Sequence, residues 1–368
     1  MPAAASRRSR SASPSAQKRA TSGRRYCRRL STKYHASSRA RASQKRAISR
    51  PGRAIRRVIA RTVPAVPVVS VIVPAHDAAA TLGRTLAALT AQRFDGGFEI
   101  VVVDDASSDA TAAVAERAGA HVVRQARRAG PAAARNAGVA VARGELLAFT
   151  DADCEPAPSW LAAGAAALRD ADLVTGPIAP TPGVAVGPFD RTLRVSGPSP
   201  LFESANLFAR RALFERVGSF ERVRGVDSAH FGEDALFGWR ARRAGARVAY
   251  APDAVVHHAV FPRGARGYVG ERTRLRHFPA LIAAAPELRG ELPAGVFLSR
   301  RTAAFDLALA GALAAAAVRA PWPLLAAVPY ARRHLRAAPG TAAAYLAGDV
   351  VGAVALLYGS ATARTLVM

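Results

Sequence analysis

The sequence predicts an α/β protein built on a mixed, mainly parallel sheet flanked by helices. Between residues 66 and 150, β-branched runs alternate with segments whose leucines have helical spacing. Such alternation is typical of parallel sheets with right-handed crossovers. In addition, the apolar segment 146–149 leads into two carboxylates, Asp151 and Asp153. Open α/β sheets bind ligands at the carboxyl ends of their strands, so a ligand site is expected there.

The expected elements follow one another along the chain. We predict strands at 68–73, 99–103, 121–124 and 146–149, and helices at 79–92, 110–118 and 131–142. In the second half, a helix of about eleven residues is expected between Glu233 and Gly245, followed by a strand at 250–258.

The charge of this 368-residue chain is concentrated at its N-terminal end. The formal net charge is +26, and residues 1–62 contain 19 Lys or Arg without any Asp or Glu. Because this segment lacks apolar periodicity, we expect a disordered tail. The tail is a tether to anionic lipid or nucleic acid, a solvated segment, or upstream sequence from a mistaken start site. The remaining 306 residues carry 33 basic and 26 acidic groups, a balance that does not indicate a nucleic-acid-binding protein.

Targeting and cysteine signals are sparse. No apolar segment precedes a small-residue cleavage site, so a secretory signal is not expected. Cys27 in the tail and Cys154 beside the two acids are not expected to pair, which fits a reducing compartment.

Two apolar, alanine-rich segments, 302–318 and 342–363, lie near the C-terminus. Both are close to the lower length limit for a membrane span, and each contains an Asp. They are either helices packed on the α/β domain or membrane-associated helices, and we expect the latter. The predicted organisation is a tail (1–62), an α/β domain (63–265), a connecting, interfacial segment (266–300) and apolar membrane-associated helices (301–368).

The acid pair Asp151 and Asp153 has the spacing for one divalent cation. Two carboxylates one residue apart at a strand exit can turn hard oxygen ligands toward one ion, which can in turn hold a diphosphate. An Asp-x-Asp after a strand is also common turn and capping chemistry. The pair alone leaves both interpretations open.

Six motifs resemble those of family 2 glycosyltransferases and occur in that family's order. They are VSVIVPAHD (69–77), IVVVDDASSD (100–109), GPAAARNAG (130–138), TDADC (150–154), SANLFARR (204–211) and GEDALFGWR (232–240). One motif would be weak evidence, whereas six in order are strong evidence. The resemblance implies a GT-A fold that binds a nucleotide-diphospho-sugar, with Mg²⁺ or Mn²⁺ as cofactor.

The resemblance implies roles for residues that bind the donor. Pro74 and its neighbours would line the base pocket, and one of Asp104 and Asp105 would contact the nucleoside. Strand-end carboxylates can accept hydrogen bonds from a base or ribose, although the pair could also cap the next helix. Arg135 could reach a phosphate or nucleobase edge, or could be a surface arginine. Its neighbour Asn136 could cap or brace the same loop.

The expected metal site centres on Asp153. By resemblance, Asp153 would be the direct ligand and Asp151 would lie near the ribose and the ion. The cation would neutralise charge as the nucleoside diphosphate departs. His257 and His258 fall on opposite faces of the expected strand, and one of them could complete the metal shell; the alternative is packing at a sheet end.

The acceptor half is expected around Glu233 and Asp234. With Trp239 and Arg240 they resemble the family's acceptor-side motif, although acids at a helix start are also favoured by the helix dipole alone. The resemblance implies Asp234 as general base and Glu233 as the residue that orients the acceptor. Asn206 is also expected to bind substrate. A base opposite a metal-held leaving group implies one in-line displacement, hence inversion.

The predicted function is sugar transfer from a nucleotide-diphospho-sugar to an acceptor hydroxyl, as in hexosyltransferases. The apolar C-terminal segments suggest a lipid-linked or cell-envelope glycan acceptor; a soluble or protein acceptor is the alternative. The family's Gln-x-x-Arg-Trp signature for processive synthesis is missing, and residues 271–278 read ERTRLRHF. Single addition is therefore expected.

Charge also predicts a membrane topology. A cytosolic nucleotide-sugar places the α/β domain on the cytoplasmic side of the cell membrane, and a simple first span would put Arg332, Arg333 and Arg336 outside. That arrangement breaks the positive-inside tendency. We therefore expect residues 302–330 to form a re-entrant or interfacial hairpin that turns at residues 321–323.

Rival classes of protein agree less well with the sequence. After the first strand, a nicotinamide dehydrogenase would carry Gly-x-Gly-x-x-Gly and a sugar nucleotidyltransferase a Gly-rich phosphate loop, but residues 74–77 read PAHD. A non-catalytic membrane or nucleotide-binding protein of the same fold would leave the acidic pairs unexplained.

Overall fold

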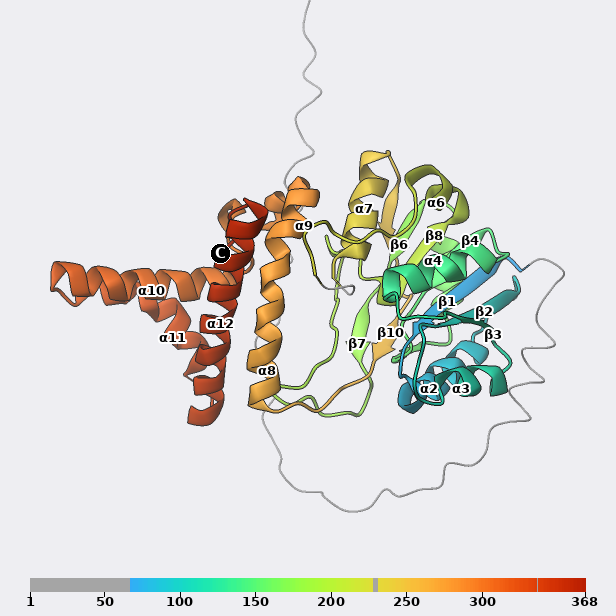
Figure 1. Cartoon of the computed structure of the whole chain (residues 1–368), viewed down its shortest axis with the longest axis horizontal. Helices are drawn as coiled ribbons and strands as arrows, with labels where there is room; N and C mark the ends of the chain where they lie inside the picture. Colours follow the sequence, from blue (N-terminus) through green and yellow to red (C-terminus); the bar gives the residue numbers. More distant parts are fainter. Residues whose placement is uncertain (1–66, 228–230, 336) are drawn as a thin grey trace, which may run out of the picture. The chain divides into compact units, whose positions relative to one another are not determined.

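The computed structural model describes residues 67–227, 231–335 and 337–368 (Figure 1). The tail predicted at 1–62 lies outside the described residues.

Within these residues, the central sheet has seven strands in the order β3-β2-β1-β4-β8-β6-β9. Neighbouring strands are parallel except at β8, which runs antiparallel to β4 and β6. The predicted mixed, mainly parallel sheet is therefore confirmed. The bounds are β1 Val69–Ala75, β2 Phe98–Asp104, β3 His121–Arg124, β4 Leu146–Phe149, β6 Leu173–Thr175, β8 Leu207–Arg210 and β9 Val248–Tyr250.

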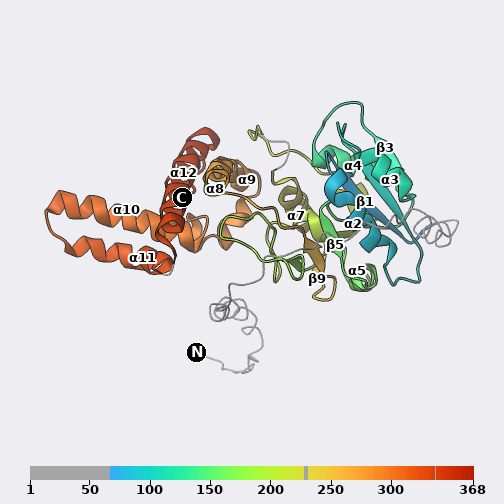
Figure 2. The ribbon, with the colours of Figure 1, turned by 90° about the horizontal axis from the view of Figure 1, so that it is seen from below.

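Helices cover both faces of the sheet because its strands are apolar on both sides, as is typical of parallel sheets (Figures 1 and 2). In β1, Val71 and Val73 belong to one core cluster with Leu82 and Leu86, while Ile72 belongs to a second cluster. The first face carries α2 Ala79–Thr90, α3 Thr111–Arg117 and α5 Trp160–Ala167; the second carries α4 Pro131–Val141, α6 Arg211–Val217 and α7 Glu233–Arg243. All predicted helices of the α/β region are present.

The register brings the motif loops to one edge. Ala75 pairs with Asp104, so β1 and β2 end together. Phe149 pairs with Ile72, which leaves the loop after β4 beside the last residues of β1. Carboxylates that follow separate strands therefore gather at one edge of the sheet, as predicted.

The strand predicted at 250–258 was wrong as a single element. β9 ends at Tyr250, and β10 Val256–His258 belongs to a second, three-stranded sheet with β5 Cys154–Pro156 and β7 Ile178–Pro180. Pro252 has no backbone N–H for a ladder, and Ala254 N donates to Ala251 O at 3.1 Å, which closes a turn. The break moves the two histidines out of the central sheet.

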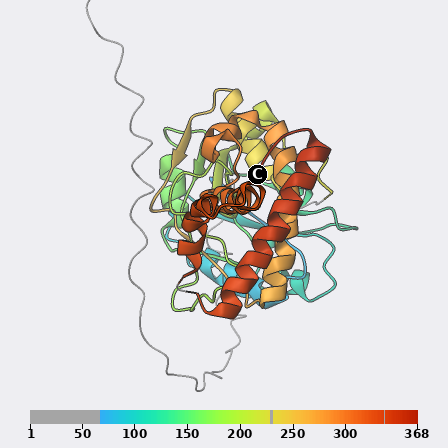
Figure 3. The same ribbon diagram turned by 90° about the vertical axis from the view of Figure 1, so that its left-hand side faces the viewer.

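The C-terminal region is helical. Its elements are α8 Ala265–Glu271, η2 Arg272–His277, α9 Phe278–Ala284, η3 Pro286–Glu291, η4 Pro293–Gly295, α10 Arg300–Val318, η5 Trp322–Ala327, α11 Val328–His334 and α12 Pro339–Ala363. One further 3₁₀ turn, η1 Ser204–Asn206, precedes β8 in the α/β region. Helix α12 packs along α8 and η2 (Figure 3). Glycines allow this approach, because a Cβ at Gly359 would lie 2.1 Å from Arg276 O.

Helix α10 ends at Arg319, a left-handed residue with φ 52°, and the chain then returns along it through η5 and α11 (Figure 2). This returning segment packs closely on α10, because a Cβ at Gly311 would lie 2.5 Å from Pro323 O. The turn predicted within 302–330 is therefore present. By length and composition alone, α10 and α12 could each cross a membrane; the position of the hairpin in a membrane stays a prediction.

Candidate active site

A cavity of about 1,030 Å³ opens at the carboxyl edge of the central sheet. It brings together the carboxylates of Asp151, Asp153, Glu233 and Asp234, which come from two motifs about eighty residues apart. Of the other predicted site residues, Pro74, Asp105, Arg135 and His258 also line it, whereas Asp104, Asn206, Trp239, Arg240 and His257 do not.

Asp153 and His258 face each other at one side of this cavity. β10 pairs antiparallel with β5, so His258 stands opposite Cys154, and its Nε2 lies 3.7 Å from Asp153 Oδ2. Burial, and then the neighbouring Asp151, raises the pKa of Asp153. A cation between these side chains would favour the ionised carboxylate and oppose that shift.

The donor atoms here fit a divalent cation. Ligand atoms of Asp153, Cys154 and His258 lie within 4.8 Å of one another. A carboxylate and an imidazole suit Mn²⁺ and related ions. Burial raises the pKa of the Cys154 thiol well above its usual value, so this sulfur stays protonated and is a poor ligand. Of the two predicted histidines, His258 is the one placed at the acids; His257 has a buried Nδ1 without a hydrogen-bond partner among the described residues.

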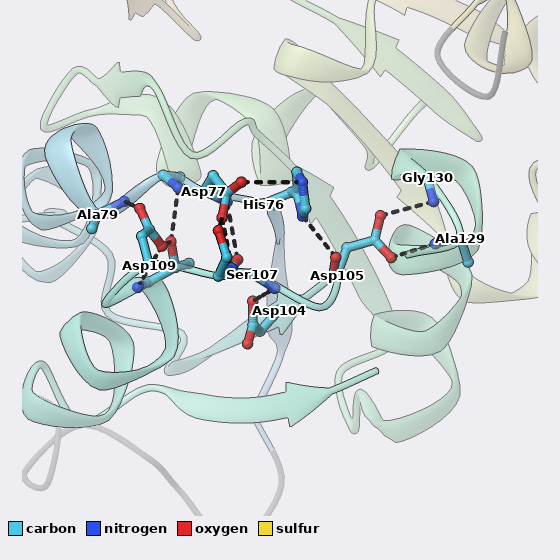
Figure 4. Close-up of polar contacts among 12 residues, drawn as sticks. His76, Asp77, Ala79, Asp104, Asp105, Ser107, Asp109, Ala129 and Gly130 are labelled. Atoms are coloured by element: carbon cyan, nitrogen blue, oxygen red, sulfur yellow. Dashed lines mark hydrogen bonds and ion pairs between the residues drawn. The ribbon is translucent and has the colours of Figure 1, made fainter. Parts of the chain in front are cut away.

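The acid pair after β2 organises loops (Figure 4). The carboxylate of Asp105 accepts hydrogen bonds from the backbone N–H groups of Ala129 and Gly130, at 2.7 and 2.8 Å. Asp104 accepts from Ser107 N at 3.1 Å. The pair therefore fixes the loop before α4 and the turn after β2, and Asp105 does so at the cavity wall. Neither acid caps the next helix, because α3 begins at Thr111 with Ala110 at its N-cap.

A second network, missed in the sequence, joins the loops after β1 and β2 (Figure 4). Asp77 Oδ1 accepts from Ser108 N at 2.7 Å, a contact that lowers the pKa of Asp77. In return, Asp109 Oδ2 accepts from Ala79 N at 3.0 Å, at the start of α2. His76 Nδ1 lies 2.8 Å from Asp105 O. These contacts lock the cavity wall that contains Pro74.

Arg135 is buried, contrary to the surface alternative. The residue as a whole is 4% exposed, and its guanidinium lies 2.8 Å from Asp151 Oδ1 and 3.1 Å from Glu233 Oε1. It therefore joins an acid of the metal side to an acid of the acceptor side. Asn136 braces a distant loop, because it donates to Phe220 O at 2.8 Å and accepts from Phe220 N at 3.0 Å.

Asp234 is a half-buried carboxylate at the start of α7. Its Oδ2 accepts from Ser204 N at 3.1 Å and from Ser204 Oγ at 3.3 Å. Burial, and then repulsion from Glu233, raises the pKa of Asp234 to about 6, while Arg135 opposes that rise. A carboxylate with this pKa is mostly ionised at neutral pH and is a stronger base than an ordinary Asp.

Asn206 has a structural role in place of the predicted contact with substrate. Its side-chain oxygen accepts from Trp160 Nε1 at 2.8 Å, and its Nδ2 donates to the carbonyls of Pro177 and Ala254 at 2.9 and 2.7 Å. The residue is 1% exposed. It therefore ties the start of α5 to the loops that contain Pro177 and Ala254.

Trp239 and Arg240 also support the site from outside the cavity. Trp239 Nε1 donates to Pro200 O at 3.0 Å, and the ring packs edge-on against Phe202. Arg240 pairs with Glu221 and donates to Ser219 O. Both residues fix loops onto α7, so their effect on the site is indirect.

Among the cavity residues absent from the predictions, three bear on the charged groups of the site. Ser204 holds Asp234, and its place at the start of the SANLFARR motif could have indicated it. Glu203 lines the cavity, and burial raises its pKa. Arg191 lies over the ring of Phe261 at 4.9 Å and lines the cavity near Asp153, where its charge opposes the rise in the pKa of Asp153. No local pattern marks Glu203 or Arg191, since both lie in irregular segments.

A mixed, mainly parallel sheet with carboxylates at its strand ends and an acid at a later helix start agrees with the GT-A fold that the motifs implied. Residues 70–219 match the family model described as Glycosyl transferase family 2. Over these residues the chain is similar to family 2 glycosyltransferases, in agreement with the motif-based prediction.

Curated relatives agree with this family. Glycosyltransferase AglE of Haloferax volcanii is 34% identical over 118 residues, which cover 30% of this chain and 39% of the relative. The pre-mycofactocin glycosyltransferase of Mycobacterium tuberculosis is 29% identical over 206 residues, covering 52% and 42%. The chain thus spans about two fifths of the length of these relatives. A solved mannosyltransferase, PcManGT from Pyrobaculum calidifontis in complex with GDP-Man and Mn²⁺, superposes with a TM-score of 0.48 and 28% identity, covering 81% of this chain and 83% of that one.

Proposed function

We propose that this chain transfers a sugar from a nucleotide-diphospho-sugar to an acceptor hydroxyl, with inversion. One observation carries the proposal. One cavity contains an acid–histidine pair suited to a cation, Asp153 and His258, and a half-buried carboxylate with a raised pKa, Asp234. Separate sites for a leaving group and for a base in one cavity are what single-displacement transfer requires.

The donor side is assigned to the loops after β1, β2 and β4. Pro74 and Asp105 line the wall where the nucleoside would bind. Asp153 and His258 would hold Mg²⁺ or Mn²⁺, with Asp151 beside them. When bound, the cation would neutralise charge on the departing diphosphate. The cation of Arg191, on the same wall, would add to that neutralisation.

The acceptor side is assigned to Asp234 and Glu233. Asp234 would take the proton of the attacking hydroxyl, and its pKa near 6 matches work at neutral pH. Ser204 holds the carboxylate in place through two donors. Glu233 lines the cavity beside it and would orient the acceptor. Attack from this side, opposite the leaving group, inverts the anomeric centre.

The acceptor is proposed to be lipid-linked or part of a cell-envelope glycan, with one sugar added per cycle. Support comes from α10 and α12, each apolar and long enough to cross a membrane. We place the hairpin within 302–330 in the cytoplasmic face of the cell membrane, with the 63–265 domain on that side and residues 266–300 at the interface. Labelling of a His334→Cys variant from outside intact cells would contradict this placement.

The donor assignment is tested by thermal stabilisation of the full-length protein in detergent. Bound ligand raises the melting temperature by mass action, so a panel of nucleoside diphosphates and nucleotide-sugars is compared with and without Mn²⁺. We expect stabilisation by one nucleotide, dependent on Mn²⁺ and lost in Asp153→Ala. If no nucleotide stabilises a folded sample, the proposal is wrong. Chromatography of the products then separates sugar transfer from nucleotidyl transfer, which would release pyrophosphate.

A further inference from the structure

Arg135, itself buried, links the two halves of the site through two ion pairs. Its side chain is 5% exposed, and the carboxylates of Asp151 and Glu233 that it binds are 32% and 9% exposed. Both acids follow Arg135 in sequence, 16 and 98 positions further along the chain. Because the guanidinium is planar and forked, it can hold both acids in fixed directions at once.

The burial of this arginine is costly for the fold. Taking a charge out of water costs several kcal/mol, and ion pairs repay that cost only with excellent geometry and full hydrogen bonding. Arg135 falls short of full hydrogen bonding, since its Nε is buried without a partner among the described residues. Apolar contacts would stabilise this position as well, so stability alone does not explain an arginine here.

We propose that Arg135 is a positioning residue that couples the donor and acceptor halves of the site: it fixes Asp151 and Glu233 and supplies the positive charge that keeps Asp234 ionised. This inference rests on the proposed function, in which Asp234 is the base. It replaces the expected contact of Arg135 with a phosphate or nucleobase.

The charges around Asp234 support this role. From its own helix, Glu233 repels the charged form of Asp234, and burial acts in the same direction. Glu203, from the loop before η1, interacts with Asp234 as a second like charge. Arg135, from α4, is the cation that opposes them. The neighbouring donors from Ser204 are neutral. Loss of the arginine charge therefore leaves a half-buried acid surrounded by acids.

A second consequence concerns the metal side. With Asp151 Oδ1 bound to Arg135, the carboxylate of Asp153 is the one left to face His258. The ion pair thereby assigns different tasks to two acids that stand two positions apart. The same arginine ties Asp151 to Glu233, so a shift on either side of the cavity is transmitted to the other.

The test is the pH dependence of kcat/KM for sugar transfer by the full-length enzyme. In Arg135→Met the acidic limb of this profile should move up by about one pH unit or more. Transfer at pH 5 should fall about tenfold or more, because well below the pKa each added unit of pKa lowers the ionised fraction about tenfold. Arg135→Lys keeps the charge without the fork, so its limb should stay near that of wild type while kcat falls. Glu233→Gln removes a repelling charge, and its limb should move down.

Arg143→Met is the matched control, because Arg143 also pairs with a buried acid, Glu99 at 2.9 Å, but outside the cavity. Its pH profile should equal that of wild type. The inference is overturned if the acidic limb of the pH profile is unshifted in folded Arg135→Met, or if it is shifted in Arg135→Lys. If Arg135→Met does not fold, the pH profiles of Arg135→Lys and Glu233→Gln decide the question. Failure of the proposed function is distinct, since wild type itself would then show neither transfer nor nucleotide-dependent stabilisation.

Discussion

The ring of Phe202 packs directly against Gly238 on α7, where a Cβ atom would lie 2.2 Å from the ring Cγ. Phe202 is 1% exposed and has a φ of 53°, a left-handed conformation that is strained for a bulky residue. The next two residues, Glu203 and Ser204, line the cavity, and Ser204 holds Asp234. The glycine thus allows a strained loop to lock onto the helix that carries the base.

Gly238→Ala should destabilise the protein and reduce activity together. The added methyl group cannot fit without moving the Phe202 ring, and overpacking of this kind costs about 1–3 kcal/mol. The melting temperature should fall by several degrees, and kcat should fall because Ser204 moves relative to Asp234. Thermal unfolding in detergent and a transfer assay measure the two effects.

Gly270→Ala is the matched control for that substitution. Gly270 lies within α8, and a Cβ there meets no atom within 4 Å. Because alanine favours helix by up to about 1 kcal/mol over glycine, this variant should be as stable as wild type or slightly more so. Equal melting temperatures for Gly238→Ala and wild type would show that the Phe202 contact is not tight.

The sequence was sufficient to predict the strand-end and helix-start acids, because their positions follow from local patterns of apolar strands and caps. It could not predict the partners of Arg135 or Asn206. Arg135 meets Glu233 across 98 positions, and Asn206 meets Ala254 across 48. Such contacts depend on how distant loops pack. The residue types allowed a ligand role in both cases, and the packing of the loops decided against it for Asn206.

The predicted strand at 250–258 failed for a local reason that the sequence did contain. A β-branched pair and two histidines suggested a continuous strand, but Pro252 removes a ladder donor in its first half. The resulting turn places β10 in the second sheet, and this is what brings His258 opposite Cys154. The break that was missed is therefore part of the site.

Asp234→Asn should abolish transfer yet stabilise the fold at neutral pH. The pKa of Asp234 is about 6 in the folded protein, compared with an ordinary value of 3.8. Between these values the folded protein binds a proton that the unfolded chain has released, so the stability contributed by this group is present below pH 3.8 and is lost as pH rises through 6. An amide carries no charge at any pH and avoids that loss.

At pH 7.5 the free energy of unfolding of Asp234→Asn should therefore exceed that of wild type by an amount on the order of a few kcal/mol, and its melting temperature should be higher accordingly. The difference should shrink toward zero near pH 4. Melting temperatures of both proteins measured between pH 4 and 7.5 test the direction of this change. A difference in melting temperature that is the same at all pH values would contradict the raised pKa of Asp234. Asp227→Asn is the control, because the Asp227 side chain is exposed and Arg276 lowers its pKa.

His258→Gln should weaken Mn²⁺ binding at least about tenfold, equal to roughly 1.4 kcal/mol, while His257→Gln should leave it unchanged. The two residues are adjacent, but only His258 faces Asp153 and lines the cavity. The measurement is the Mn²⁺ concentration that gives half-maximal thermal stabilisation in the presence of a nucleoside diphosphate. Equal effects of the two substitutions would show that His258 acts through packing of β10 and not as a ligand.

Trp322 provides a direct readout of membrane insertion by the hairpin. The sequence contains three tryptophans; Trp160 and Trp239 are 0% and 6% exposed, whereas Trp322, on η5, is 68% exposed. Its neighbours Leu324 and Leu325 are also exposed, at 47% and 71%. An apolar turn of this kind with a tryptophan is suited to the bilayer interface.

On addition of phospholipid vesicles to the full-length protein, we expect the emission of Trp322 to shift to shorter wavelength and to be quenched by brominated acyl chains. Trp322→Phe should remove both changes without affecting vesicle binding, and Leu325→Glu should weaken binding because it places a charge at the inserting turn. If the protein binds vesicles but Trp322 emission stays unchanged, the hairpin is outside the bilayer and another segment makes the contact. Quenching only by bromines near the lipid headgroups would place the turn at the interface, whereas quenching by deep bromines would indicate a re-entrant hairpin.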